Sequence, residues 1–124
     1  MRAEDEPVLI LFAREPVPGG AKTRLAGELG ADGAARLAAR MIDWTIDNAV
    51  RHWPGPVRLA VWPPSSEPRL MAKVSLPVCA QRGENLGERM ANAIADAGGP
   101  AAVVGCDVPH LDGGVLPESA RLLR

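Results

Sequence analysis

Short apolar runs alternate along the chain with longer segments in which apolar residues recur every three or four positions. Four apolar runs are bounded by charged residues, prolines or glycines, which is typical of strands buried on both faces of a parallel sheet. These runs span residues 8–13, 57–62, 76–80 and 101–105. The third run contains Pro77, which indicates the end of a strand or the edge of the sheet because proline donates no backbone hydrogen bond.

The segments between these runs have helical periodicity. The pattern predicts helices over residues 32–52, 65–71, 85–97 and 115–123. Asp32 is a good N-cap for the first of them, and Asn85 or Gly87 opens the third. In the first helix one face is expected to carry Leu37, Met41 and Trp44, with a neighbouring apolar stripe of Ala34, Ala38, Ile42 and Ile46 beside it. In the third the expected apolar side consists of Leu86, Met90, Ala93, Ile94 and Ala97.

Strictly alternating strands and helices predict a single α/β domain over residues 1–124. The expected fold is a Rossmann-like three-layer sandwich with helices on both faces of a mainly parallel sheet, in the strand order 3-2-1-4. That order makes the first and last strands neighbours. Ligands of such sheets bind beyond the carboxyl ends of the strands, close to the switch in strand order. The segments after residues 13, 80 and 105 are therefore expected at one edge.

Composition excludes several classes of function. The net charge is −1, so bulk charge gives no reason to expect binding to a nucleic acid polymer or an anionic membrane. Aromatic residues make up 3% of the 124 residues, too few for a single-strand stacking surface. The sequence shows neither a signal peptide nor an apolar stretch long enough to cross a bilayer. We therefore expect a cytoplasmic protein whose two cysteines, Cys79 and Cys106, are buried thiols.

The loop after the first strand is the most unusual segment. In FAREPVPGGAKTRL, Gly19 and Gly20 allow a sharp turn close to a ligand, and Lys22 and Arg24 supply positive charge. The segment is not a Walker A motif, because Ala21 separates the glycines from the lysine. From these residues alone, a phosphate site and an ordinary strand-to-helix connection are equally good interpretations.

Two further segments carry candidate chemistry, each with an ordinary structural alternative. Asp107 follows the last strand, where a carboxylate suits a hard cation such as Mg²⁺ but also suits a turn or helix cap. The segment Gln81 to Met90 contains glycines that allow close contact with a base or ribose, yet it also fits a capped helix start. The three tryptophans are expected to pack around the first long helix and second strand.

Three spaced motifs together resemble a known family. They are Phe12 to Leu25, Gln81 to Met90, and Gly105-x-Asp107-x-Pro109-x-Leu111. In this order they are similar to the glycosyltransferase-like DUF2064 proteins, grouped with the GT-A nucleotide-diphospho-sugar transferases and similar to the molybdenum-cofactor and phospholactate guanylyltransferases. The family pattern continues beyond the Asp107 segment, so the resemblance implies a nucleotide-binding part without the acceptor-binding part. Asp112-Gly113-Gly114 comes too early to equate with the later family motif.

The resemblance implies particular roles. Lys22 and Arg24 would bind phosphates and act, with Asp107, as catalytic residues, and Asp107 would hold Mg²⁺ or Mn²⁺. The implied nucleotide-binding residues are Ala13, Arg14, Gly19, Gly20, Lys22, Thr23, Arg24, Gly83, Asn85, Leu86 and Gly87. The ligand would be a nucleoside triphosphate or a nucleotide sugar.

Three hypotheses of different classes remain open. The first is a metal-dependent nucleotidyl- or glycosyltransferase. The second is a truncated nucleotide-binding or interaction module without turnover, in which uncovered sheet and helix surfaces favour a homodimer. The third is a structural α/β domain whose loop only connects two elements.

Overall fold

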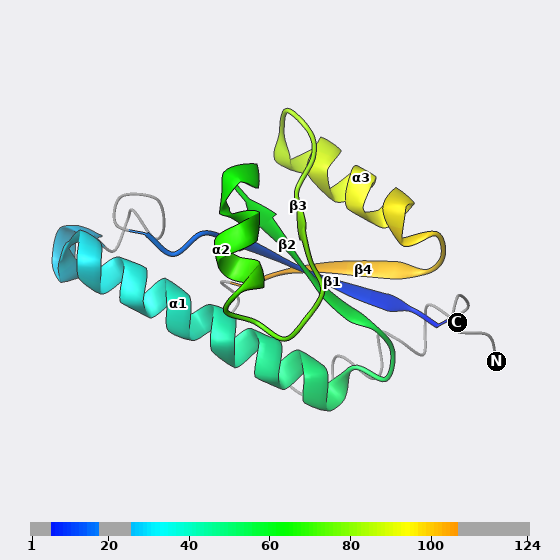
Figure 1. Cartoon of the computed structure of the whole chain (residues 1–124), viewed down its shortest axis with the longest axis horizontal. Coiled ribbons are helices and arrows are strands. Elements are labelled where there is room, and N and C mark those ends of the chain that lie inside the picture. The colour runs from blue at the N-terminus through cyan, green and yellow to red at the C-terminus, as the bar shows by residue number, and fades with distance from the viewer. Residues whose placement is uncertain (1–5, 18–25, 107–124) are drawn as a thin grey trace.

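The fold is built on a sheet of four parallel strands in the order β3-β2-β1-β4. The computed structural model describes residues 6–17 and 26–106. Its strands are β1 (Val8–Arg14), β2 (Val57–Trp62), β3 (Val78–Ala80) and β4 (Ala101–Gly105). The register sets Leu9 beside Val57 on one side and Ala102 on the other. Both the parallel sheet and the predicted order are confirmed, and β1 and β4 are neighbours (Figure 1).

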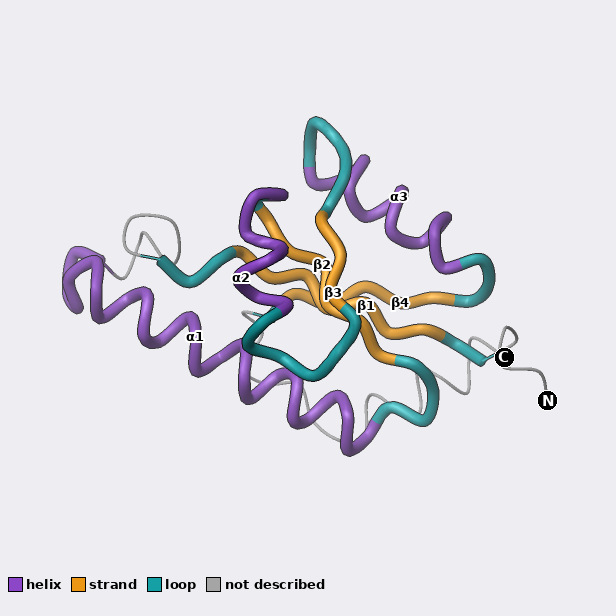
Figure 2. Tube along the Cα trace, in the orientation of Figure 1, coloured by secondary structure: helices purple, strands orange, loops and turns teal. Residues whose placement is uncertain are grey.

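Helices cover the two faces of the sheet, which gives three layers (Figure 2). The first face packs against α1 (Ala26–His52) and α2 (Glu67–Met71). The second packs against α3 (Leu86–Ala97). Successive strand residues point to opposite faces, so Leu9 and Leu11 join the first cluster while Ile10 and Phe12 join the second. This double burial explains why β1 is an uninterrupted apolar run.

Helix α1 consists of two helical segments that meet at Gly30, whose φ of 76° is left-handed. A short segment starts at Ala26, and the continuous helix through His52 begins directly after Gly30, close to the predicted start at Asp32. Asp32 therefore lies in the first turn after the break and is not the N-cap of the helix. A glycine tolerates this backbone conformation without strain, which is how the long helix changes direction there.

Two predicted apolar faces are only partly correct. The sheet-facing side of α1 is made of small residues and one isoleucine: Ala34, Ala35, Ala38, Ile42 and Ala49. Trp44, expected on a buried face, is 45% exposed. In α3, Met90, Ala93 and Ala97 pack on the sheet as predicted, whereas Leu86 and Ile94 are exposed.

Several shorter predictions are also resolved. The strand expected at residues 76–80 forms only over Val78–Ala80, and Pro77 precedes it at the sheet edge. The short helix expected at 65–71 is a 3₁₀ turn, Pro64–Ser66, followed by α2.

Cys106 is buried, but Cys79 is exposed, contrary to the prediction of two buried thiols. The helix expected at 115–123 lies outside the described residues. No helix in the described part of the chain has the length and apolarity needed to cross a membrane.

The start of α3 is fixed by a capping box. The Asn85 side chain accepts a hydrogen bond from the Glu88 backbone at 2.9 Å, and the Glu88 carboxylate accepts from the Glu84 backbone at 3.0 Å. Asn85 rather than Gly87 is therefore the N-cap. The helix ends at Gly98, whose φ of 74° is the left-handed conformation typical of a glycine at this position.

Candidate functional site

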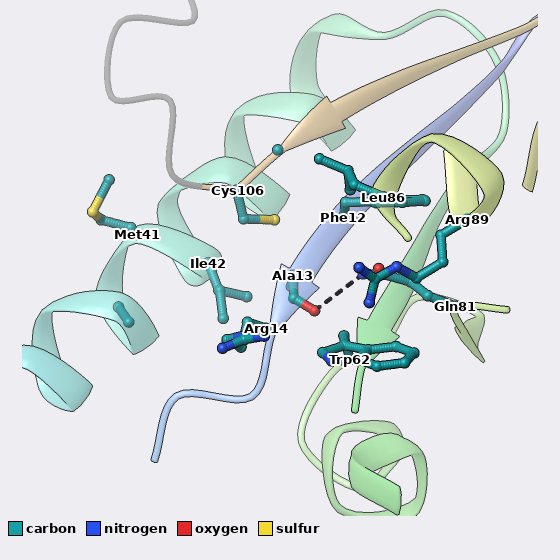
Figure 3. Close-up of a pocket in the computed structure, with 12 residues that line it drawn as sticks. Phe12, Ala13, Arg14, Met41, Ile42, Trp62, Gln81, Leu86, Arg89 and Cys106 are labelled. Carbon is teal, nitrogen blue, oxygen red and sulfur yellow. Dashed lines mark hydrogen bonds between the residues drawn. The ribbon is translucent and has the colours of Figure 1, made fainter. Parts of the chain in front are cut away.

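A cavity of about 390 Å³ lies at the carboxyl edge of the sheet, where the sequence predicted a ligand site. Its floor consists of the ends of β1, β2 and β4, and its walls come from α1 and the start of α3 (Figure 3). The described lining residues are Phe12, Ala13, Arg14, Ala38, Met41, Ile42, Trp62, Gln81, Leu86, Arg89, Gly105 and Cys106. We call this cavity the edge pocket. Its volume lies in the range of small-molecule sites.

Hydrogen bonds hold the floor of the edge pocket between β1 and β4. The Cys106 backbone donates to the carbonyl of Phe12 at 2.9 Å, which continues the ladder one residue past β4. The buried Thr45 hydroxyl of α1 lies 3.3 Å from the Cys106 carbonyl and 2.7 Å from that of Met41. The point where the chain leaves β4 is thus tied to both a strand and a helix.

Gln81 joins the ends of two strands beneath the pocket. Its side chain is buried, with 6% exposed, and its amide nitrogen donates to the carbonyl of Ala60 at 3.0 Å and to that of Ala13 at 3.5 Å (Figure 3). Its backbone nitrogen donates to Val61 at 2.9 Å. A buried amide whose hydrogens are both used stiffens the edge where β1 and β2 end.

A cation–π contact forms one wall of the pocket. The guanidinium carbon of Arg89 lies 4.0 Å from the centre of the Trp62 ring, and both side chains line the cavity. The Nε atom of Arg89 is buried and has no hydrogen-bond partner among the residues that the structure describes. Trp62 ends β2 and Arg89 lies in the first turns of α3, so the contact joins the sheet to the helix.

The exit of β1 is fastened to α2 by an ion pair. Both nitrogens on one side of the Arg69 guanidinium donate to the two carboxylate oxygens of Glu15, the longer contact being 2.8 Å. The Glu15 backbone also donates to the Trp62 carbonyl at 2.8 Å. The hydrogen bond from Arg69 lowers the pKa of Glu15 below its ordinary value, and burial opposes that shift. The chain therefore leaves the sheet in a fixed direction before the basic loop.

The edge pocket gathers some of the predicted site residues. Ala13, Arg14 and Leu86 line it as expected. Gly83, Asn85 and Gly87 do not appear among its described lining residues. Their nucleotide contacts stay predictions, as do those of the residues outside the described ranges: Gly19, Gly20, Lys22, Thr23, Arg24 and Asp107.

Two of the non-lining residues have a visible structural role. Asn85 caps α3. Gly83 has a φ of 143°, and a Cβ atom there would lie 2.8 Å from the Arg89 backbone nitrogen. Position 83 therefore needs glycine so that the loop can pass close to the start of α3.

Sequence reasoning missed Trp62, Arg89 and Gln81 as residues of the pocket. Trp62 was assigned to packing, and the other two were assigned to a motif without individual roles. The available signal was their position, because Trp62 and Gln81 occur where apolar strands end. Arg89 lies one helical turn after the capping residue.

The described part of the edge pocket is cationic. Arg14 and Arg89 line it, whereas no aspartate or glutamate occurs among its described lining residues. Across residues 6–17 and 26–106 no group of three metal-binding side chains is found either. These residues suit an anionic ligand and do not by themselves build a site for Mg²⁺ or Mn²⁺. The predicted metal ligand, Asp107, follows Cys106 directly and lies beyond the described range.

The strand order, the three layers and the ligand-sized cavity at the switch point define a Rossmann-like α/β protein. The chain belongs to the DUF2064 family of uncharacterised proteins conserved in bacteria, whose family model matches residues 45–124.

One solved structure extends this comparison. It is a "putative nucleotide-diphospho-sugar transferase" from Desulfovibrio desulfuricans, which shares 25% sequence identity and superposes with a TM-score of 0.86. The match covers 94% of this chain and 54% of that protein, so the chain spans about half the length of its structural relative. No functionally curated protein matches the sequence.

Proposed function

We propose that this chain carries the donor site of a nucleotidyl- or glycosyltransferase and binds a nucleoside triphosphate or nucleotide sugar in the edge pocket. The observation that carries the proposal is the cationic cavity between β1 and β4 at the carboxyl edge of the sheet. The anionic part of a ligand would meet Arg14, and its base would meet Arg89, Phe12 and Leu86. The similarity to a protein named as a nucleotide-diphospho-sugar transferase supports the same ligand class.

The proposal assigns the phosphates to the basic loop. Lys22, Arg24 and the backbone around Gly19, Gly20 and Thr23 would bind them, since the loop continues from Arg14 at the pocket rim. Asp107 would hold Mg²⁺ or Mn²⁺, which when bound neutralises charge on phosphate oxygens. Ala13, Gly83, Asn85, Leu86 and Gly87 would lie along the base and ribose.

The residues of this chain would act mainly by positioning and electrostatics. Transfer from a phosphoanhydride needs charge stabilisation and alignment more than a covalent intermediate on the protein. In the described part, Gln81 and the Glu15–Arg69 pair hold the strand ends that present Arg14 and Trp62. Fixed strand ends keep the cationic groups in place without reorganisation when a ligand binds.

The experiment is isothermal titration calorimetry with nucleoside triphosphates and nucleotide sugars, each with and without Mg²⁺. Removal of a charged contact in Arg14→Ala should weaken binding roughly 10- to 100-fold. Arg51→Ala is the matched control, because Arg51 pairs with Asp47 on the exposed surface of α1. Absence of binding by every nucleotide, or equal affinity in the Arg14→Ala variant, would contradict the proposal.

A second candidate is a nucleotide-binding module without turnover. The described lining residues include no histidine, lysine, aspartate or glutamate that would act as a general base. Binding with no product formed from any donor, together with a dimer in light scattering, would favour this candidate. Transfer to an acceptor by the monomer would exclude it. A cytoplasmic location and the absence of nucleic acid partners stay predictions from the sequence.

A further inference from the structure

Arg89 differs from the arginines that form ion pairs in the described structure. Arg51, Arg69 and Arg82 each pair with a carboxylate and are exposed. Arg89 is partly buried, no ion pair of it is found among the described residues, and its guanidinium contacts an aromatic ring instead.

The local structure makes this position unfavourable for an isolated cation. Arg89 follows the N-cap Asn85 by one turn, where the backbone groups of α3 present partial positive charge. The neighbouring carboxylate of Glu88 is already engaged by Glu84 and Asn85 in the capping box. The buried Nε atom donates to no acceptor within residues 6–17 and 26–106. An arrangement that costs free energy without a ligand is characteristic of binding sites.

The contact with Trp62 gives the pair a defined shape. A guanidinium group is planar and delocalised, so at 4.0 Å from the indole centre it covers one face of the Trp62 ring and is itself held there as a flat surface. Both partners are held by backbone hydrogen bonds, Trp62 through its carbonyl to Glu15 and Arg89 through its nitrogen to Asn85. Figure 3 shows the two side chains together at one side of the cavity, with Leu86 and Phe12 near them.

We propose that the Arg89–Trp62 pair is the surface that selects the base of the bound nucleotide, and that it favours purines over pyrimidines. This inference rests on the proposed function. A base stacks on the guanidinium that Trp62 holds, and the larger ring system of a purine also reaches the neighbouring apolar side chains of Phe12 and Leu86 more than a pyrimidine does. The phosphates and ribose are common to all four nucleotides, so discrimination depends on contacts with the base, and this pair supplies the stacking contact.

The test compares the dissociation constants of ATP, GTP, CTP and UTP by calorimetry. Wild type should bind the two purine nucleotides roughly 5- to 100-fold more tightly than the two pyrimidine nucleotides, the range of a single base-stacking contact. Arg89→Lys retains the charge but loses the plane, so the purine preference should fall to about twofold or less. Pyrimidine nucleotides should bind this variant nearly as well as they bind wild type.

Control variants separate stacking from charge and from folding. Arg82→Lys retains an exposed ion pair in the same region and should leave the preference unchanged. Trp62→Leu should reduce the preference as Arg89→Lys does, and thermal unfolding of each variant checks that the fold is intact. Tryptophan fluorescence gives a second readout, because ATP should quench wild type more than Trp62→Phe, which retains Trp44 and Trp53.

The outcomes distinguish this inference from the proposed function. If all four nucleotides bind wild type with equal affinity, the proposal that Arg89 and Trp62 select the base is wrong. The proposal that the edge pocket binds nucleotides is then still supported. If Arg89→Lys or Arg89→Ala weakens all four equally, and weakens inorganic pyrophosphate as well, Arg89 is a phosphate contact and the inference is overturned. If no nucleotide binds wild type, both proposals are overturned.

Discussion

The two faces of the sheet are packed very differently. Beneath α1 and α2, Leu9, Leu11, Leu59 and Val61 are fully buried, and α1 adds buried side chains along its length. On the opposite face α3 contributes no residue that is itself buried. Its Leu86 is 55% exposed and its Ile94 is 43% exposed. The first face thus forms the main hydrophobic core, and the second is held by fewer apolar contacts.

The core that stabilises the domain and one wall of the edge pocket therefore depend on different kinds of contact. The edge pocket takes its floor from strands fixed by the main core, and one wall from the start of α3. That wall is positioned by the capping box at Asn85 and by the stacking of Arg89 on Trp62 rather than by burial. A binding wall supported by polar contacts can change in sequence with little loss of the core that keeps the domain folded.

The largest expected effect tests the contrast between the two faces directly. Leu59→Ala, on the α1 face, should lower the free energy of unfolding by about 2–5 kcal/mol because it leaves a cavity in the main core. Met90→Ala, on the α3 face, should cost roughly 1–2 kcal/mol since the side chain is only half-buried. Urea unfolding followed by circular dichroism gives both values. Equal costs would mean that the faces contribute alike.

A smaller effect is expected at the start of α3. Asn85→Ala removes the side-chain acceptor for the Glu88 backbone and should cost about 1 kcal/mol. Asn85→Ser supplies another good N-cap and should restore most of that loss. Amide hydrogen exchange of α3 is the local readout. Unchanged protection in Asn85→Ala would show that packing, not capping, holds the helix.

The smallest effect concerns the ion pair that fastens α2 to the exit of β1. Because the folded state lowers the pKa of Glu15, the pair contributes stability above the usual glutamate pKa of about 4.3, and this is lost as pH falls through the folded value. The difference in melting temperature between wild type and Glu15→Gln should therefore be full at pH 7 and shrink toward pH 3. The effect is modest because Arg69 is more than half exposed.

A matched variant checks that this response belongs to Glu15. Asp47→Asn breaks the exposed pair with Arg51 in α1 and should change the melting temperature little at either pH. A difference between wild type and Glu15→Gln that stays constant from pH 7 to pH 3 would mean that the carboxylate is not stabilised by Arg69.

The sequence predicts the sheet well because each strand is a compact apolar run between strong breakers. Residues 57–62 and 101–105 form strands with the predicted bounds. Helix ends were harder to predict, since Asp32 has the side chain of a cap but follows a glycine break inside the helix. Trp44 was difficult for another reason. Helical spacing predicts two adjacent apolar stripes, and the sheet contacts the stripe that contains Ala34, Ala38 and Ile42 rather than the one that contains Trp44.

The sequence predicted a ligand site at the carboxyl edge of the sheet, where the edge pocket lies, but it did not identify several of the residues that line the pocket. Arg14 was expected at this edge because it follows the first apolar run, and the strand order places the end of that strand at the switch point. Ala13 came only from the family resemblance, and the binding roles of both residues stay predictions. Trp62 and Arg89 meet only in three dimensions, and local pattern does not reveal that an indole at one strand end lies beneath a guanidinium from a later helix. Glu15 was missed for the same reason, because its partner Arg69 belongs to another element.

The strand register has a consequence for synthesis on the ribosome. The central strand β1 pairs on one side with β4, and Leu9 is matched with Ala102, about 90 residues later. At a translation rate of roughly 5–20 residues per second, the ribosome synthesises β4 on the order of 5–20 s after β1. During this interval one side of the most apolar strand has no neighbour within the emerging chain. The nascent polypeptide therefore passes through a stage in which its future centre is an open edge.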